Sequence, residues 1–144
     1  MSAATTHSNA EVVREMYAVL DEGGREPADP IRAIELIDPD VEITESPELP
    51  GELSGRGYAN LLRADRVLQD AFDDHRNELE SVVELDDGRV FVLLRFIATG
   101  KSSGVPVEAQ MAHLLTLREG RVHRWAMYGD RARAIRDAGI EAAG

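Results

Sequence analysis

The stretch Val105–Tyr128 constrains the fold more than any other part of the chain. It reads VPVEAQMAHLLTL, then Arg118-Glu119-Gly120, then RVHRWAMY, so two runs of strand-forming residues flank a short turn. Gly120 can adopt a positive φ without a Cβ clash, which suits a three-residue loop that combines a type I turn with a bulge. The sequence therefore predicts an antiparallel β-hairpin at this place.

The register of this hairpin decides which of its side chains share a face. The predicted turn forms four cross-strand pairs: Leu117 with Arg121, Leu115 with His123, His113 with Trp125, and Met111 with Met127. Because side chains alternate across a strand, one face then carries Met111, His113, Leu115, Trp125 and Met127. An apolar face with one histidine in its middle can line a pocket.

The rest of the chain has helical periodicity first and strand periodicity later. Helical spacing and end signals predict helices at Ala10–Glu22, Pro30–Ile37, Tyr58–Phe72 and Arg131–Ala138. Strand periodicity predicts Val41–Glu45 and a second hairpin, Leu79–Leu85 with Val90–Ala98, around Asp87-Gly88. Helices followed by a meander of strands indicate an α+β fold with a curved sheet wrapped around helices.

The second hairpin has a strong two-residue turn signal at Asp87-Gly88, typical of a type I′ turn. The resulting register places Val83 on the core face and sets Glu80 opposite Arg95. Arg95 then has two interpretations, an anion-binding group in a pocket or one partner of a cross-strand ion pair.

Two positions on the predicted helices also bear on a pocket. Tyr17 borders the apolar stripe of the first helix, either as a tyrosine at the edge of the core or as a site residue. On the third helix, Leu61 and Leu68 are expected to be buried, and Asp65 is expected on the solvated side.

Glu45 is the most informative carboxylate in the sequence. Val41 and Ile43 precede it at the strand period of two. If these two residues face the core, Glu45 must face it as well.

Composition excludes several classes of function. The 144 residues fit one domain, expected at residues 10–144 after a disordered tail at residues 1–9. A formal charge of −11 repels phosphate backbones and anionic lipid, so neither nucleic acid nor membrane is an expected partner. With no cysteine, thiolate nucleophiles and Cys-ligated metals are excluded. No secretory signal or membrane-spanning run is recognisable, so the cytoplasm is the expected location.

Two segments, LIDPDVEITE and HLLTLREGRVHRWAMYGDRARAIRDAG, resemble the NTF2-like superfamily, and most of all its SnoaL-like branch of small bacterial proteins. The resemblance extends over residues 10–139. It implies a cone-shaped, cystatin-like α+β barrel whose curved, mostly antiparallel sheet wraps around the N-terminal helices, with a mainly apolar cavity and usually a homodimer. Members include ketosteroid isomerases, polyketide cyclases, epoxide hydrolases, dehydratases and binding proteins, so the fold alone fixes no reaction.

The resemblance also assigns roles to individual positions. Glu45 falls where ketosteroid isomerases have their general-base aspartate, and His113 falls where they have the protonated aspartate of the oxyanion hole. SnoaL-type polyketide cyclases similarly carry a histidine in a segment like AHLLTL. The chain departs from both patterns elsewhere: the isomerases' helix-one tyrosine aligns with Met16 rather than Tyr17, and the cyclases' catalytic aspartate aligns with Met127.

A carboxylate and an imidazole that converge on an apolar chamber can support proton transfer next to a carbonyl. Glu45 would be the base, and the His113 Nε2–H would bind the developing enolate oxygen. The residues expected to contact a small, flat, apolar ligand are Met16, Tyr17, Met111, Leu115, Trp125 and Met127. The corresponding function is that of a cofactor-independent isomerase, cyclase or lyase.

The alternative is a non-catalytic ligand-binding or accessory protein with the same pocket. In that case Glu45 lies in water at the pocket mouth, and His113 is a core histidine bonded to a backbone carbonyl. No cofactor is expected. A zinc site is not expected either, because His113 and His123 share the predicted hairpin face without a third ligand at a recognisable spacing.

The predicted hairpin also has an apolar outer face, opposite the pocket. It carries Ala112, Leu114, Val122 and Ala126, a patch that a second sheet could cover. The sequence therefore predicts a homodimer.

Overall fold

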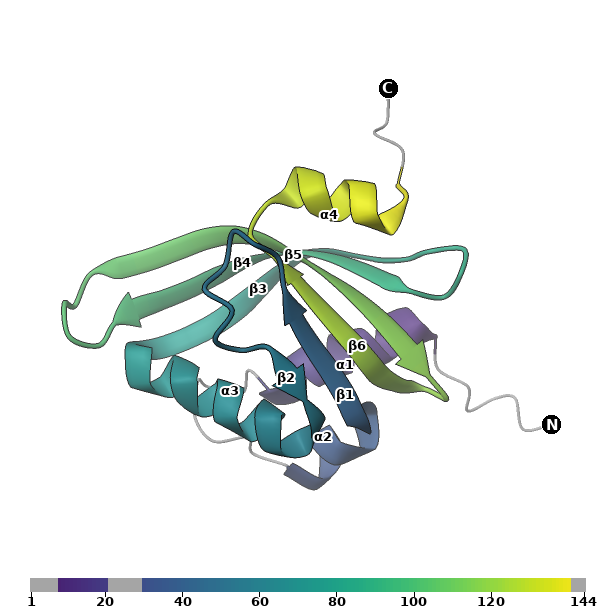
Figure 1. Ribbon diagram of the computed structural model, residues 1–144, viewed down its shortest axis with the longest axis horizontal. Helices are drawn as coiled ribbons and strands as arrows, with labels where there is room; N and C mark the ends of the chain where they lie inside the picture. The colour runs from purple at the N-terminus through teal and green to yellow at the C-terminus, as the bar shows by residue number, and fades with distance from the viewer. Residues whose placement is uncertain (1–7, 21–29, 141–144) are drawn as a thin grey trace.

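The computed structural model describes residues 8–20 and 30–140, which form an α+β fold (Figure 1). The helices are α1 (Asn9–Leu20), α2 (Pro30–Leu36), α3 (Gly57–Ala71) and α4 (Arg131–Ala138). The strands are β1 (Ile37–Glu45), β2 (Gly55–Arg56), β3 (Phe72–Glu84), β4 (Val90–Gly100), β5 (Pro106–Arg118) and β6 (Arg121–Tyr128). The predicted fold class is confirmed.

The strands form one six-stranded sheet in the order β2-β1-β6-β5-β4-β3. The neighbouring pairs are antiparallel except β1 with β6, which run parallel. The sheet is strongly curved but does not close into a complete barrel (Figure 1). Its concave side is therefore free to receive helices.

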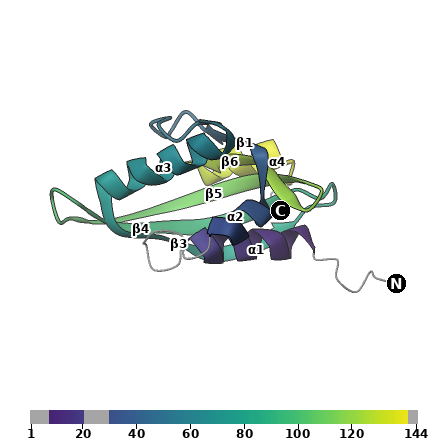
Figure 2. The same ribbon diagram turned by 90° about the horizontal axis from the view of Figure 1, so that it is seen from below.

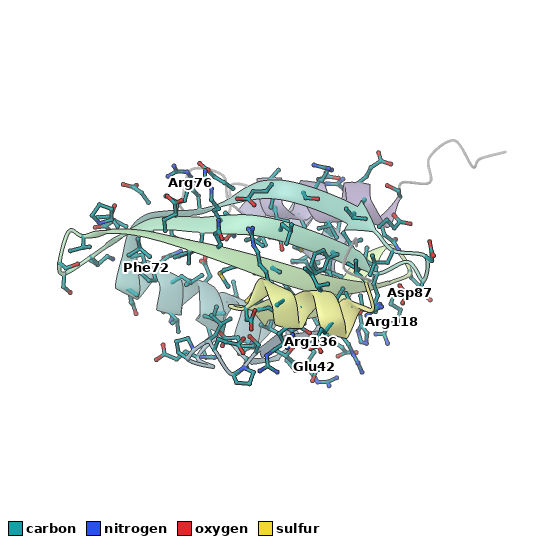
Figure 3. All side chains as sticks on the ribbon, turned by 90° about the horizontal axis from the view of Figure 1, so that it is seen from above. Glu42, Phe72, Arg76, Asp87, Arg118 and Arg136 are labelled. Carbon is teal, nitrogen blue, oxygen red and sulfur yellow. The ribbon has the colours of Figure 1, made fainter. Side chains whose placement is uncertain are left out.

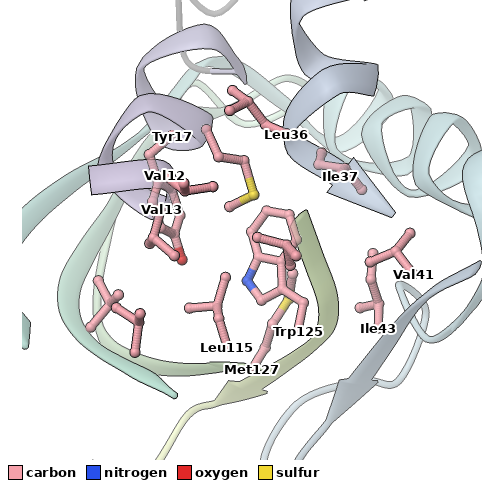
Figure 4. Close-up of a cluster of buried hydrophobic side chains, with 14 of the residues drawn as sticks. Val12, Val13, Tyr17, Leu36, Ile37, Val41, Ile43, Leu115, Trp125 and Met127 are labelled. Atoms are coloured by element: carbon pink, nitrogen blue, oxygen red, sulfur yellow. The ribbon is translucent and has the colours of Figure 1, made fainter. Parts of the chain in front are cut away.

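Helices cover both faces of the curved sheet. The larger core joins α1 and α2 to the concave faces of β1, β4, β5 and β6, and its side chains interdigitate around Trp125 (Figure 4). Seen from below, α1 with α2 and α3 run along the two sides of β4 and β5 (Figure 2). On the outer face, α4 packs against Phe91, Ala112 and Leu114 in a second, smaller core.

A reciprocal capping box begins α1. The Glu11 N–H donates to Ser8 Oγ at 3.1 Å, and the Ser8 N–H donates to Glu11 Oε1 at 3.1 Å. Residues 1–7 of the expected tail lie outside the described residues, as does the predicted end of the helix at Glu22. Ser8 and Asn9, the last two residues of that tail, belong to the cap and the first turn of α1.

Strand β1 begins earlier than predicted. Asp38-Pro39 was expected to separate a helix from a strand, yet β1 starts at Ile37 and runs through both residues. A register irregularity between Ile37 and Glu42 accommodates the proline, because a bulge needs no ladder hydrogen bond at that position. Buried Asp38 stabilises the irregularity by accepting the Asp40 N–H at 2.8 Å.

The β5–β6 hairpin has a shorter turn than predicted. Glu119 and Gly120 have φ values of 53° and 76°, so they form a two-residue loop of the primed kind, and Arg118 pairs with Arg121. A bulge at His123 then shifts the register by one further residue, and Leu115 pairs with Trp125. The predicted pair of Leu117 is therefore wrong by one residue, and the pairs beyond the bulge are wrong by two. The predicted face survives, because a shift of two preserves the alternation.

The β3–β4 hairpin has a longer turn than predicted. The Leu85 N–H donates to the Arg89 oxygen at 2.7 Å, which closes a three-residue loop around Asp87-Gly88. This displaces the register by one, so Val82 packs on the core and Val83 is 47% exposed. The turns of both hairpins lie at one end of the sheet, near Asp87 and Arg118, and Phe72 lies towards the other end (Figure 3).

A second irregularity in β3 changes the residue that lies directly opposite Arg95, which is Glu78 rather than Glu80. The guanidinium contacts Glu78 at 2.7 Å and Glu108 at 2.9 Å, and the predicted partner Glu80 remains within 3.5 Å. Of the two interpretations of Arg95, the structure supports the ion pair.

The predicted dimer face is only partly free. Helix α4 covers Ala112 and Leu114, and Val122 belongs to the concave core instead of the outer face. The bulge at His123 is the reason, because it reverses the alternation between Val122 and the later residues of β6. The homodimer stays a prediction.

Candidate functional site

A cavity of about 540 Å³ lies between α3, the segment after β1 and the concave side of the sheet. Its walls are mostly apolar, with Trp125, Met111 and Phe96 on the sheet and Leu61 and Leu68 on α3. This volume lies within the range typical of small-molecule sites, on the order of 300–1,000 Å³.

His113 lies in the wall of this cavity and is only 3% exposed. Its Nδ1 accepts a hydrogen bond from Trp125 Nε1–H at 3.0 Å, and the Tyr17 hydroxyl lies 2.5 Å from the same nitrogen. Because an indole N–H can only donate, Nδ1 must be the unprotonated nitrogen. The neutral ring therefore carries its hydrogen on Nε2, which has no hydrogen-bond partner among the residues that the structure describes.

Burial sets the protonation state of His113. It lowers the pKa of the imidazole to about 3, because the charged form would lose its hydration. The rings of Tyr17 and Trp125 also enclose the imidazole, with centroid distances of 5.9 Å and 5.8 Å. At neutral pH, His113 is an oriented, uncharged hydrogen-bond donor.

Glu45 ends β1 and lines the same cavity, half-buried. Its Oε1 accepts the Leu53 N–H at 2.8 Å and lies 3.5 Å from Ser54 Oγ. Within the described part of the chain, the other oxygen, Oε2, has no hydrogen-bond partner. The carboxylate is thus fixed by one oxygen, and the second is available to a ligand.

The register of the sheet brings Glu45 and His113 together. Glu45 on β1 pairs with Met127 on β6, and Met127 pairs with His113 on β5. The two polar groups therefore lie in one cross-strand row, separated by two strand spacings, roughly 9–10 Å between backbones. All three side chains line the cavity, so a ligand lying over Met127 can reach both polar groups.

The structure separates the predicted ligand contacts into two groups. Met111, Trp125 and Met127 line the cavity. Met16 and Leu115 are fully buried in the core and are absent from the cavity wall. Tyr17 is also buried away from the wall, and its hydroxyl contacts His113. Helix α1 explains this division, because it packs directly over that part of the concave face.

Sequence reasoning missed the contribution of α3. Asp65, expected on the solvated side, lines the cavity, and burial raises the pKa of its carboxyl group. The signal was present in the spacing, because Asp65 lies four residues after Leu61 and three before Leu68, on one helical face. Asn77 on β3 also lines the cavity.

The described residues contain no cluster of three or more histidine and carboxylate side chains that could hold a metal ion. His123 occupies the β6 bulge, so it does not pair with Leu115 as the predicted register required. Among the helices of residues 8–20 and 30–140, none is long and apolar enough to span a membrane.

Comparison with known proteins identifies a family and a fold. A family model for the SnoaL-like domain matches residues 13–125. No curated protein matches the sequence.

Solved structures resemble the chain over most of its length. An NTF2-like protein of unknown function from Burkholderia pseudomallei is 22% identical, with a TM-score of 0.71, and the match covers 91% of this chain and 97% of that one. TerC, crystallised with polyporic acid, is 21% identical at a TM-score of 0.70, over 89% and 95% of the two chains. The candidate polyketide cyclase IdmH from Streptomyces antibioticus is 20% identical at a TM-score of 0.67, over 93% and 100%. At these identities the likeness establishes the fold.

Proposed function

The chain belongs to the SnoaL-like domain family of the NTF2-like superfamily, and we propose that it is a cofactor-independent enzyme that transfers a proton next to the carbonyl group of a small apolar molecule. One observation carries this proposal. Glu45 and His113 lie in the same cross-strand row and line the same apolar cavity, with Met127 between them.

The two side chains have complementary roles in such a reaction. Glu45 Oε2 takes a proton from the carbon next to the carbonyl, and the electrons of that C–H bond move onto the carbonyl oxygen. His113 Nε2–H donates a hydrogen bond to the enolate oxygen that forms. In a ketone with a neighbouring double bond, return of the proton to the far carbon of the dienolate completes an isomerisation. In a cyclisation the enolate carbon attacks a second carbonyl, and the alkoxide that forms takes the proton back from Glu45.

The low pKa of His113 suits this role. A neutral imidazole keeps its Nε2 proton and stabilises the enolate as a hydrogen-bond donor. Tyr17 and Trp125 act as positioning residues, because their polar hydrogens hold the Nδ1 side of the ring and leave the Nε2–H for the ligand.

Binding without catalysis is the second candidate function. It is favoured by the hydrogen bond from the Leu53 N–H to Glu45 Oε1, which holds the segment after β1 against that strand. This gives Glu45 a structural role in the cavity wall that requires no catalysis. Both candidates use the same cavity. TerC, which shares the fold, was crystallised with polyporic acid, and this supports a small-molecule ligand for either candidate.

The assembly and location that we propose are a homodimer in the cytoplasm. The outer face of β1, β6 and β5 at the edge of the α4 core, around Thr44, Ala126 and Thr116, would meet a second copy. Light scattering of the purified protein at micromolar concentration should report twice the chain mass. A monomer would contradict the proposed assembly.

The proposed reaction predicts solvent exchange of one carbon-bound proton. Native mass spectrometry of freshly purified protein would first identify any retained molecule. That molecule, or the model ketone 4-acetylbiphenyl, is then incubated with the protein in D₂O, and deuterium uptake next to its carbonyl is followed by NMR. The wild-type protein should catalyse uptake, and Glu45→Gln should retain ligand binding but lose at least about a hundredfold in rate, since an amide cannot accept the proton.

Glu42→Gln is the matched control for this experiment. Glu42 lies on the same strand, outside the cavity wall, and its carboxylate is 3.5 Å from the Arg56 guanidinium. Its substitution should leave deuterium uptake unchanged. If Glu45→Gln exchanges at the wild-type rate, Glu45 is not the base, and the binding function is favoured.

A further inference from the structure

The cavity extends well beyond the row that contains Glu45 and His113. His113 pairs with Val92 on β4, and Phe96, which also lines the cavity, lies four residues further along that strand. Four residues of an antiparallel strand span about 13 Å. The cavity therefore has a second end, near Phe96 and its partner Asn77 on β3.

Asp65 provides a polar group at this second end. Gln69 Nε2–H donates to Asp65 Oδ2 at 2.7 Å, whereas Oδ1 has no hydrogen-bond partner within the described ranges. The ring of His75 stacks on Phe96 at a centroid distance of 6.3 Å, and His75 also acts electrostatically on the Asp65 carboxyl group. Asp65, Phe96 and its strand partner Asn77 all line the cavity, and His75 connects Asp65 electrostatically to the Phe96 ring, so these residues mark one region of the cavity.

The two polar ends are separated by an apolar passage. Met111, which pairs with Leu94 between Val92 and Phe96, lines it on the sheet side, and Leu61 lines it on the α3 side. A ligand that fills this passage is elongated and apolar in its middle. A small ketone held only by Glu45 and His113 would leave the Asp65 end empty.

We propose that Asp65 forms a second recognition subsite, which binds a hydroxyl group at the far end of an elongated apolar ligand whose carbonyl group lies between Glu45 and His113. The position of the carbonyl rests on the function proposed above. The position of the hydroxyl rests on the cavity and on Asp65, and it holds for an enzyme and for a binding protein alike.

A hydroxyl group fits this subsite better than a charged group. A carboxylate would be repelled by Asp65 itself. An ammonium group would have to give up its hydration inside a largely apolar passage. Burial raises the pKa of the Asp65 carboxyl, so the carboxylate is poorly hydrated and gains from a neutral donor directed at Oδ1.

Two ketones of the same framework test the proposal. 4-Acetyl-4′-hydroxybiphenyl carries a carbonyl at one end and a hydroxyl at the other, and 4-acetylbiphenyl lacks the hydroxyl. Trp125 is the only tryptophan of the chain and lines the cavity, so quenching of its fluorescence reports binding, with calorimetry as a second readout. The variants are Asp65→Asn and Asp65→Leu, with Asp70→Asn as the matched control on an exposed position of the same helix.

We expect wild-type protein to bind the hydroxylated ketone about tenfold more tightly, the effect of one hydrogen bond to a charged group. Asp65→Leu should remove this preference without weakening the binding of 4-acetylbiphenyl, and Asp65→Asn should reduce it. Asp70→Asn should keep the wild-type preference. Unfolding by denaturant shows whether each variant is folded.

The possible failures are distinguishable. Equal affinity of wild-type protein for the two ketones, or an undiminished preference in Asp65→Leu, would overturn the hydroxyl subsite and leave the carbonyl site intact. A hydroxyl preference that depends on Asp65 without any deuterium uptake would support the subsite and contradict the enzymatic function. If calorimetry detects binding of neither ketone to wild-type protein, both the subsite and the cavity's role are contradicted.

Discussion

The two ends of the cavity hold their polar groups in different ways. Near β1, His113 is enclosed by Tyr17 and Trp125, and Glu45 is fixed by a backbone amide from the following segment. Near α3, Asp65 has one hydrogen bond, and its donor is Gln69 on the same helix. The first end therefore orients its groups through several elements, as chemistry requires. The second end offers one adaptable acceptor, which suits recognition.

Burial also acts on the two ends with opposite sign. It lowers the pKa of His113 and raises the pKa of Asp65, because in each case the charged form loses hydration. Acidification should therefore destabilise the protein through His113, whereas a rise in pH should destabilise it through Asp65.

The largest expected effect is the pH dependence of stability that His113 causes. Below about pH 6.5 the unfolded chain binds a proton at this histidine, and the folded protein does not until about pH 3. Stability should fall across that window by up to about 5 kcal/mol from this group alone. His113→Gln, which keeps an acceptor and a donor but does not titrate, should lack this part of the decline in denaturant unfolding curves. If the free energy of unfolding declines in parallel with pH for wild-type protein and His113→Gln, His113 is not a buried, neutral group.

The next effect concerns catalysis at the same end. His113→Phe removes the donor to the enolate oxygen. This should raise the activation free energy of deuterium uptake by about 3 kcal/mol and slow the uptake accordingly. Ligand affinity should change less, because the donor acts mainly in the transition state. His113→Gln, which retains an N–H group, should recover part of the rate. Equal losses in affinity and rate would instead indicate that His113 only binds.

A smaller effect is expected from the residues that orient His113. Tyr17→Phe removes the hydroxyl at Nδ1 and should cost about 1 kcal/mol of stability, with a measurable change in the imidazole ¹⁵N shifts that report the tautomer. Tyr58→Phe is the control, because its hydroxyl donates to the Ile37 oxygen at 2.7 Å, away from His113. Identical ¹⁵N spectra for Tyr17→Phe and wild-type protein would show that Tyr17 does not position the ring.

The smallest effect is expected at the α3 end. Since burial raises the pKa of Asp65, its ionised form destabilises the fold at neutral pH and the protonated form does not. Asp65→Asn should therefore stabilise the protein slightly at pH 7, and this gain should disappear at pH values below the unfolded pKa of about 4. A destabilised variant at pH 7 would show that Asp65 has a structural role.

The sequence predicts the β1 end of the cavity better than the α3 end, for a physical reason. The observed β5–β6 turn is one residue shorter than predicted, and the bulge at His123 shifts the register by one more residue. Strand alternation still places His113 and Trp125 on one face, because the two shifts sum to an even number. In the β3–β4 hairpin a single shift reversed the face of Val83. Loop length contributes to the register of both hairpins. In the β3–β4 hairpin, the Asp87-Gly88 pair does not distinguish a loop of two residues from a loop of three.

Other features depend on tertiary packing, which a local pattern alone does not decide. Asp65 shares a helical face with Leu61 and Leu68, but its charge predicts a solvent-exposed position. The packing of α3 over the cavity places it in the cavity wall instead. Tyr17 and Met16 are adjacent on α1, and the register of that helix on the sheet determines that the Tyr17 hydroxyl reaches His113. These contacts join segments 96 residues apart in the sequence.

The central claim is that Glu45 and His113 act together on one bound carbonyl compound. A double-mutant cycle of Glu45→Gln and His113→Phe, measured by deuterium uptake next to the carbonyl, tests it most directly. If both groups serve the same proton transfer, the double variant should be little slower than the slower single variant, because the effects are less than additive. Fully additive effects, or a Glu45→Gln variant with wild-type exchange, would contradict the claim.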